Sequence, residues 1–140
     1  MDEGAAKIRI VIIDDEKELV NTIKEFLEQR GFEVISAFGG KKGLEVVKQE
    51  KPDLVILDIA MPDMDGRDVL INLKKDEEMK DIPVLMLSGR GGQFDEEYGM
   101  ELGAEQYVAK PYRGEALLEQ IKKVLSGEKK DVPGSPGEEK

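Results

Sequence analysis

Residues 54–66 read LVILDIAMPDMDG. The residues before Asp58 are apolar without a break, which is typical of a strand that is buried on both faces. The run stops at Asp58, and the residues after it are rich in Pro, Asp and Gly, which favour turns. This stretch therefore predicts a strand inside a parallel sheet that ends in a carboxylate at the start of a loop.

Similar apolar runs recur along the chain and alternate with segments of helical period. In the first such segment, Leu19, Ile23 and Phe26 fall on one face of a helix. Five strands alternating with five helices predict an α/β fold, a parallel sheet with helices on both faces. The expected strands are Ile8–Ile13, Phe32–Ala37, Leu54–Leu57, Val84–Leu87 and Gln106–Ala109, and the expected helices lie around residues 19–27, 41–50, 69–73, 94–102 and 117–125.

The composition is that of one globular domain without Cys or His. A chain of 140 residues with 39% hydrophobic residues suits a single core. Without Cys and His there is no disulfide, no thiol nucleophile and no common zinc ligand, so chemistry must use carboxylates, hydroxyls, amines or a hard metal ion. No apolar run approaches the roughly 18 residues of a membrane span. The acidic N-terminus also lacks the signal-peptide pattern, so we expect a cytoplasmic protein without membrane contact.

The net charge of −10 argues against direct nucleic-acid binding, which needs clustered Lys and Arg. It favours solubility and basic partners, although a merely solvated acidic surface is an equally good interpretation.

Four of the expected strands end in chemically complementary groups. Asp14 and Asp15 follow the first strand, Asp58 the third, Ser88 the fourth and Lys110 the fifth. Right-handed crossovers bring the carboxyl ends of parallel strands to one edge, where ligands bind. Each residue alone has a simpler interpretation, since Asp and Ser often cap helices or begin turns and Lys is commonly exposed. Their joint occurrence favours a shared site.

Three carboxylates close together repel one another unless they gain protons or share a cation. Mg²⁺ fits best, because it prefers oxygen ligands and often takes one or two carboxylates together with a phosphate. Lys110 and Ser88 would add a positive charge and a hydroxyl donor, which outlines a phosphoryl-transfer site. Asp58, on the central strand, is the expected nucleophile. Asp14 and Asp15 would hold the metal.

The chain resembles the receiver domains of two-component response regulators. The resemblance covers roughly residues 7–126, and it implies a flavodoxin-like, doubly wound sheet of strand order 2-1-3-4-5. It rests on Asp14-Asp15, residues 54–66, Leu87-Ser88, Leu102-Gly103-Ala104 and Lys110-Pro111.

The resemblance implies a role for each matched residue. Asp58 would take a phosphoryl group from a sensor histidine kinase or phosphotransfer protein. Asp15 would bind Mg²⁺ directly, Asp14 would assist through water, and the backbone carbonyl of Ala60 would complete the protein ligands. Lys110 and Ser88 would contact the phosphoryl group.

The resemblance also implies a switch. Ser88 would move toward the phosphoryl group and Tyr107 would turn inward, changing the face formed by the fourth helix, fifth strand and fifth helix. A partly buried strand tyrosine with a wet hydroxyl is the simpler interpretation of Tyr107. Ala60 and Arg90 occupy positions that vary in the family and tune the lifetime of the phosphoryl group.

The domain organisation follows from the same patterns. Residues 1–6 are expected to be disordered, and residues 127–140, made of Gly, Pro and charged residues with almost nothing to bury, to be a disordered tail or a truncated linker. After Leu125 there is no room for a helix-turn-helix. The output partner would therefore be a downstream protein or a fused output domain, with the receiver a monomer or a phosphorylation-dependent dimer.

Three alternative functions differ in what they require. A hydrolase of the haloacid dehalogenase type would need an Asp two residues after the nucleophile, where this chain has Ala60. A flavin-binding domain would need a phosphate-binding loop after the first strand, where Asp14-Asp15-Glu16 would repel phosphate. An unphosphorylated interaction module, or pseudo-receiver, would not need the matched site residues. We therefore expect a phosphoacceptor switch and no turnover enzyme beyond self-phosphorylation and self-dephosphorylation.

Overall fold

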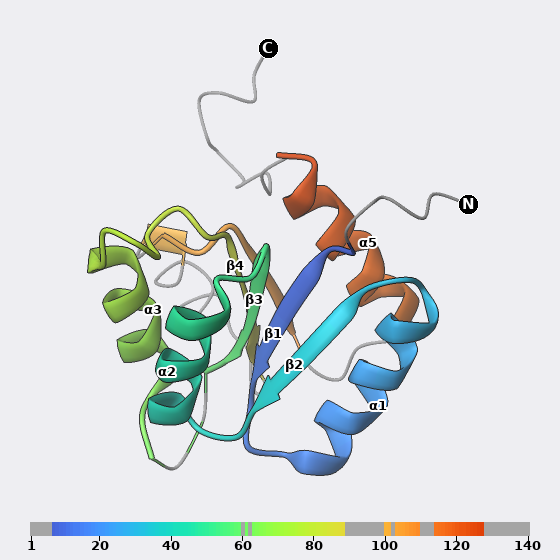
Figure 1. Ribbon diagram of the computed structural model, residues 1–140, viewed down its shortest axis with the longest axis horizontal. Helices are drawn as coiled ribbons and strands as arrows, with labels where there is room; N and C mark the ends of the chain where they lie inside the picture. The colour runs from blue at the N-terminus through green and yellow to red at the C-terminus, as the bar shows by residue number, and fades with distance from the viewer. Residues whose placement is uncertain are drawn as a thin grey trace.

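A computed structural model describes residues 7–59, 61, 63–88, 100–101, 103–109 and 114–127, with only the backbone described at Ser88 and Ala109. Five parallel strands form one sheet of order β2-β1-β3-β4-β5, which confirms the expected fold class (Figure 1). The elements are β1 Arg9–Ile13, α1 Lys17–Gln29, β2 Glu33–Ala37, α2 Gly40–Glu50, β3 Leu54–Asp58, α3 Gly66–Lys75, β4 Val84–Ser88, β5 Gln106–Ala109 and α5 Gly114–Leu125. Of the helix expected at 94–102, only Met100 and Glu101 lie in the described residues, and both are helical.

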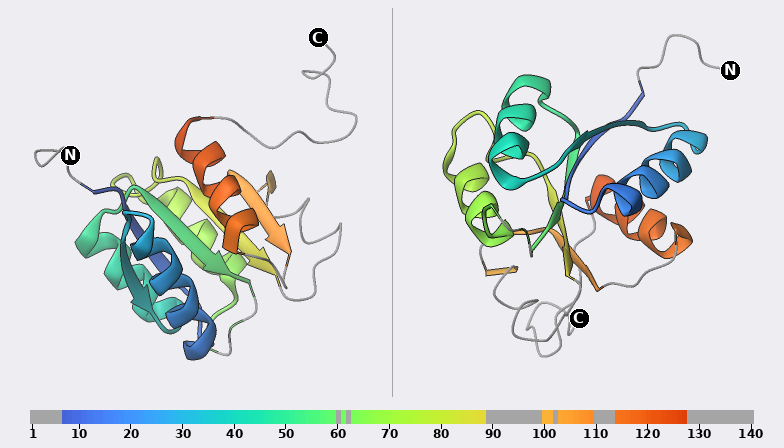
Figure 2. Two further views of the ribbon diagram at one scale, coloured as in Figure 1. Left: turned by 90° about the vertical axis from the view of Figure 1, so that its right-hand side faces the viewer. Right: turned by 90° about the horizontal axis from the view of Figure 1, so that it is seen from below.

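The core has two layers, one on each face of the sheet. Successive residues of a strand point to opposite faces, so β1 sends Val11 and Ile13 to one layer and Ile10 and Ile12 to the other. Helices α2 and α3 cover the first face, and α1 and α5 cover the second (Figure 2). The central strands are therefore apolar throughout because both of their faces are buried.

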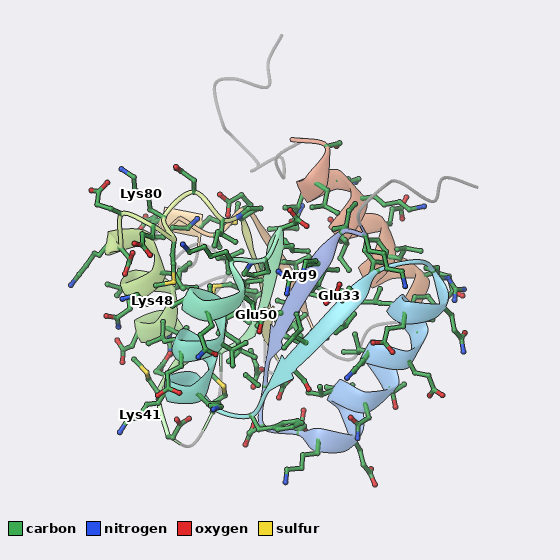
Figure 3. The ribbon with its side chains drawn as sticks, in the orientation of Figure 1. Arg9, Glu33, Lys41, Lys48, Glu50 and Lys80 are labelled. Carbon is green, nitrogen blue, oxygen red and sulfur yellow. The ribbon has the colours of Figure 1, made fainter. Side chains whose placement is uncertain are left out.

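The first strand begins one residue later than expected. Ile8 is 40% exposed, and the strand starts at Arg9. The backbone amide of Arg9 donates to the Asp53 carboxylate at 2.8 Å, and its guanidinium contacts Glu50 and, at 3.5 Å, Glu33 (Figure 3). These contacts join β1, β2 and the end of α2 at the amino-terminal edge of the sheet.

Gly31 ends helix α1. The Gly31 amide donates to the Glu28 carbonyl at 3.1 Å and the Phe32 amide to the Leu27 carbonyl at 3.2 Å. Gly31 has a φ of +95°, which glycine adopts without steric cost. This paired arrangement is a Schellman motif, and it turns the chain directly into β2.

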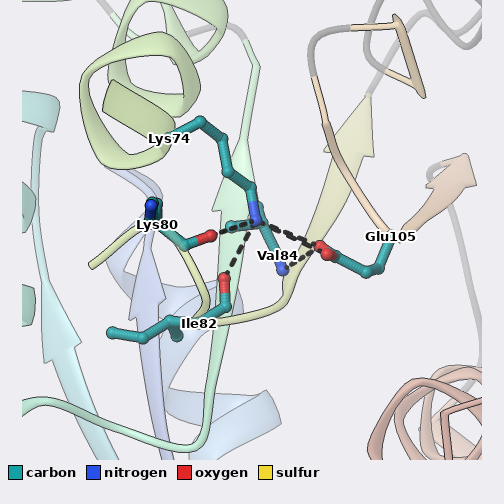
Figure 4. A network of polar contacts seen from close by, with 5 residues as sticks. All are labelled: Lys74, Lys80, Ile82, Val84 and Glu105. Atoms are coloured by element: carbon teal, nitrogen blue, oxygen red, sulfur yellow. Dashed lines mark hydrogen bonds and ion pairs between the residues drawn. The ribbon is translucent and has the colours of Figure 1, made fainter. Parts of the chain in front are cut away.

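A second polar network also lies at the amino-terminal edge. The ammonium of Lys74, at the end of α3, donates to the carbonyls of Lys80 and Ile82 at 3.2 and 3.1 Å and lies 3.5 Å from the Glu105 carboxylate (Figure 4). Glu105 in turn accepts the Val84 amide at 2.8 Å. The network fixes the start of β4 against α3 and against the residues that precede β5.

The loop after Asp58 is closed by a very close backbone approach at Gly66. The Gly66 amide donates to the Ile59 carbonyl at 2.8 Å. A Cβ atom added at Gly66 would lie 2.2 Å from the Asp58 carbonyl oxygen and 2.7 Å from the Ile59 Cα. Only a residue without a side chain therefore allows α3 to start so near the end of β3.

We expect Gly66→Ala to lower the free energy of unfolding by about 2–3 kcal/mol, measured by urea denaturation, because the added methyl group meets rigid backbone. Helix propensity alone would favour Ala in α3 by about 1 kcal/mol, so a loss can only come from the clash. The control Gly31→Ala, where nothing lies within 4 Å but φ is +95°, should cost only about 1 kcal/mol. An unchanged or raised stability of Gly66→Ala would contradict the close approach.

Candidate metal centre

Three carboxylates meet at the carboxyl edge of the sheet. Asp14 follows β1, Asp15 is the next residue, and Asp58 ends β3, which pairs directly with β1. Oxygen atoms of all three lie within 4.8 Å of one another. Asp14 and Asp58 are almost fully buried, with exposures of 0% and 3%, and Asp15 is partly exposed. The acids that the sequence assigned to one site are thus together in the structure.

The backbone fixes Asp14 between two strands. Its amide donates to the Ala37 carbonyl at the end of β2, at 3.1 Å. Its Oδ1 accepts the Glu16 amide at 3.0 Å, which turns the chain toward α1. The N-cap residue of α1 is Glu16, whose side chain makes no capping hydrogen bond. The simpler interpretation of Asp14 and Asp15 as helix caps is therefore not the arrangement found.

The donor set suits a hard divalent cation. Three carboxylates offer only oxygen, the ligand type that Mg²⁺ and Ca²⁺ prefer. Burial of two of them makes their mutual repulsion stronger than it would be in water. A bound cation would offset this repulsion, and the partial exposure of Asp15 leaves its side chain in contact with solvent.

The ends of β4 and β5 lie beside this cluster. Asp58 pairs with Leu87, the Ile59 amide donates to the Leu87 carbonyl at 3.0 Å, and Ser88 pairs with Ala109. The backbone of Ser88 is therefore at the edge where the sequence placed it. The Ser88 side chain and the expected site residues Ala60, Arg90 and Lys110 lie outside the described residues.

Tyr107 occupies an inward position on β5. It pairs with Met86 and is 7% exposed. It belongs to the core layer under α2 and α3, which also holds Met61 from the loop after Asp58. The simpler interpretation, a partly buried tyrosine, is therefore wrong about burial, because Tyr107 packs into the core.

Two acids in the loop after Asp58 hold helix N-termini. Asp65 caps α3 by accepting the Arg67 amide at 2.8 Å, and the Arg67 guanidinium bonds to the same carboxylate. This side-chain contact, followed by the amide hydrogen bond, holds the pKa of Asp65 below its usual range. Asp63 accepts the amides of Gly40 and Lys41 at the start of α2, and these bonds likewise lower its pKa.

Sequence reasoning treated Asp63 only as a turn residue. The missed signal lies elsewhere in the chain, because Gly39 and Gly40, at the start of α2, have no side chain that could cap that helix. A helix without a local cap needs an acceptor from another segment, although the sequence does not say which one.

Comparison with known proteins agrees with this geometry. Residues 10–122 match the response regulator receiver domain family. The match covers most of the chain, so this protein belongs to the receiver domain family of two-component response regulators. Members of this family are in general signalling switches rather than enzymes, and neither the hydrolase nor the flavin-binding alternative is favoured.

Individual relatives agree in sequence and in fold. The alkaline phosphatase synthesis transcriptional regulatory protein PhoP of Bacillus subtilis is 35% identical over 127 residues, which are 91% of this chain and 52% of that protein. The chain thus spans about half the length of this relative. Among solved structures, chemotaxis protein CheY4 of Vibrio cholerae has a TM-score of 0.81 at 26% identity, covering 85% of this chain and 99% of that one.

A CheY-like response regulator receiver domain protein of Methanospirillum hungatei gives the same TM-score of 0.81 at 30% identity, covering 86% of this chain and 95% of the other.

Among the described residues, no helix has the length and apolar character needed to cross a membrane.

The lowered pKa of Asp65 gives its hydrogen bonds a defined pH dependence. The folded state binds the proton less readily than the unfolded state, so the contribution is complete above the unfolded pKa and is lost as pH falls through the folded pKa. We expect the difference in unfolding free energy between wild type and Asp65→Asn, measured in urea, to be largest near pH 6 and to shrink below about pH 4. A difference that stays constant over this range would show that the charge of Asp65 is not stabilised in the fold.

The repulsion among the three acids predicts an unusual pair of effects for Asp15→Asn. With a chelator present, this variant should be about 1–2 kcal/mol more stable than wild type, because one charge leaves the cluster. With Mg²⁺ added, wild type should gain stability that rises with the logarithm of the Mg²⁺ concentration above its Kd, and the variant should gain much less. Thermal unfolding in both conditions measures these effects.

Asp81→Asn is the matched control, because Asp81 is an exposed acid in the connection before β4, away from the cluster. It should keep the full response to Mg²⁺. An equal gain in stability with Mg²⁺ in Asp15→Asn would show that Asp15 does not bind the metal.

Proposed function

We propose that this receiver domain takes a phosphoryl group on Asp58, from a sensor histidine kinase or phosphotransfer protein, in a reaction that needs Mg²⁺. The observation that carries the proposal is the cluster of Asp14, Asp15 and Asp58 within 4.8 Å at the carboxyl edge of the sheet. A doubly wound sheet binds its ligands at this edge. Asp58 ends the central strand, between β1, which Asp14 and Asp15 follow, and β4, which ends at Ser88.

The chemical step is a transfer between two nucleophiles. A carboxylate oxygen of Asp58 forms a bond to phosphorus while the bond from phosphorus to the donor's imidazole nitrogen breaks. The electron pair of the broken bond stays on that nitrogen, which takes up a proton. The product is an acyl phosphate on Asp58 and a neutral histidine on the donor. Bound Mg²⁺ would supply positive charge against the phosphoryl oxygens.

Asp14 and Asp15 would divide the task of holding the metal. Asp15 would bind it directly, and its partial exposure suits a ligand that is reached from solvent. Asp14 would act through water, in keeping with the hydrogen bond that its Oδ1 already accepts from Glu16. The carbonyl of Ala60 would be the remaining protein ligand. Lys110 and Ser88 would bind phosphoryl oxygens, and Ala60 and Arg90 would set how fast the group is lost.

The switch would run through Ser88 and Tyr107. The residue paired with Ser88 on β5 is Ala109, two positions after Tyr107, so movement of Ser88 would act directly on the strand that carries Tyr107. Phosphorylation would add charge and strong hydrogen-bond acceptors at the site, and would thereby shift the equilibrium between the conformations of β5 before and after Ser88 moves. The output face would comprise residues 94–102, β5 and α5.

The output partner would be a downstream protein or a fused output domain. The named transcriptional role of the Bacillus subtilis relative, of which this chain matches about half, is in keeping with a fused domain. The net charge of −10 fits a receiver that does not itself contact nucleic acid. The receiver would act as a monomer or as a phosphorylation-dependent dimer in the cytoplasm.

Intact mass after incubation with a small acyl-phosphate donor and Mg²⁺ tests the proposal directly. Wild type should gain one phosphoryl group, because the site carries both the nucleophile and the metal ligands. Asp58→Asn should gain none, and a chelator should prevent the gain in wild type.

A matched variant, Asp53→Asn, keeps Asp58 and alters an exposed acid at the opposite edge, so it should still gain the group. No gain in folded wild type would instead favour the interaction module that is never phosphorylated. A gain that persists in Asp58→Asn would place the acceptor elsewhere.

A further inference from the structure

Helix α2 begins without a cap of its own. Its N-cap residue, Gly39, has a φ of +118° and makes no side-chain hydrogen bond to the helix. The first amides of a helix have no partner within the helix and need acceptors from elsewhere. At this position the local sequence, Gly39-Gly40-Lys41, offers none.

The acceptors come from Asp63, which lies in the loop after Asp58. Its Oδ1 accepts the Gly40 amide at 3.0 Å and its Oδ2 accepts the Lys41 amide at 3.2 Å. Both carboxylate oxygens are therefore used on a segment more than twenty residues earlier in the chain. Lys41 lies at the start of α2, near the carboxyl edge of the sheet, and its side chain points outward (Figure 3).

The backbone of α2 is shaped for this contact. A Cβ atom at Gly39 would lie 3.2 Å from the Asp63 Oδ2, so a side chain there would crowd the carboxylate. A Cβ atom at Gly40 would lie 2.8 Å from the Met64 Cβ and 2.9 Å from the Val69 Cγ2. The two glycines thus let the loop after Asp58 lie directly against the start of α2.

The contact joins the two sides of the acidic edge. On one side, the segment that leads to α2 follows β2, whose last residue, Ala37, accepts the Asp14 amide. On the other side, Asp63 is connected through the loop closed by Ile59 and Gly66 to Asp58. The repulsion between the carboxylates pushes these two sides apart, and the hydrogen bonds of Asp63 hold them together.

We propose that Asp63 is a positioning residue for metal binding, which lowers the cost of bringing the carboxylates of Asp14, Asp15 and Asp58 together around a divalent cation. Asp63 itself touches neither the metal nor the phosphoryl group. The inference rests on the proposed function for the identity of the cation, but the contact between Asp63 and α2 stands independently of phosphorylation.

The test compares Asp63→Ala, Asp63→Asn and wild type by calorimetric titration with Mg²⁺. Asp63→Ala should bind Mg²⁺ about fivefold more weakly, as expected for the loss of one capping interaction. Asp63→Asn should bind Mg²⁺ only about twofold more weakly, because its amide oxygen can still accept the Gly40 amide although its amide nitrogen cannot accept the Lys41 amide. Both variants remove the same charge and the bond to the Lys41 amide, so the difference between them isolates the hydrogen bond to the Gly40 amide.

Two further measurements separate positioning from general damage. Amide exchange of Gly40 and Lys41 should accelerate in Asp63→Ala, with circular dichroism unchanged. Phosphorylation of Asp58 by the acyl-phosphate donor should need about fivefold more Mg²⁺ for half-maximal rate, while the rate at saturating Mg²⁺ stays within about twofold of wild type. Asp68→Ala, an exposed acid on α3, is the control and should match wild type throughout.

Unchanged Mg²⁺ affinity in Asp63→Ala would overturn the proposal, as would equal weakening in Asp63→Ala and Asp63→Asn, which would show that the hydrogen bond to the Gly40 amide contributes nothing. Unchanged exchange at Gly40 and Lys41 would also overturn it. Failure of the proposed function is a different result, in which wild type binds Mg²⁺ but takes no phosphoryl group.

Discussion

The mutual repulsion of three carboxylates at one edge of the sheet is the constraint on which this structure depends. Asp14 and Asp58 cannot move apart without breaking the pairing of β1 with β3, whose residues are buried on both faces. The apolar sheet therefore holds the acids in an arrangement that they would not adopt by themselves. A bound cation would offset the repulsion that opposes the cluster, and this would couple metal binding to the stability of the whole domain.

The architecture could be predicted from local patterns, because the apolar runs and the residues that end them are encoded within each segment. Asp14, Asp15 and Asp58 were predicted as one site because parallel strands bring their carboxyl ends together. The contacts of Arg9 with Glu50 and Asp53 could not be predicted, since they join segments that lie far apart in the chain. The role of Asp63 was missed for the same reason.

The two core layers give the acidic edge different surroundings on its two faces. Tyr107 and Met61 belong to the layer under α2 and α3, together with the residues that pack against the loop after Asp58. The layer under α1 and α5 contains neither. A displacement of Tyr107 would therefore change side-chain packing in the layer under α2 and α3. At the amino-terminal edge of the sheet, the Lys74–Glu105 network would still hold the starts of β4 and β5 in place.

The strand order has a consequence for the behaviour of many copies of the chain at high concentration. The most apolar strands, β1, β3 and β4, are all interior, and the two edge strands are β2 and β5. Strand β2 begins with the charged Glu33 and includes the polar Ser36, which makes it a poor template for another chain. The hydrophobic segments that build the site are thus shielded from edge-to-edge aggregation by the order in which the strands pair.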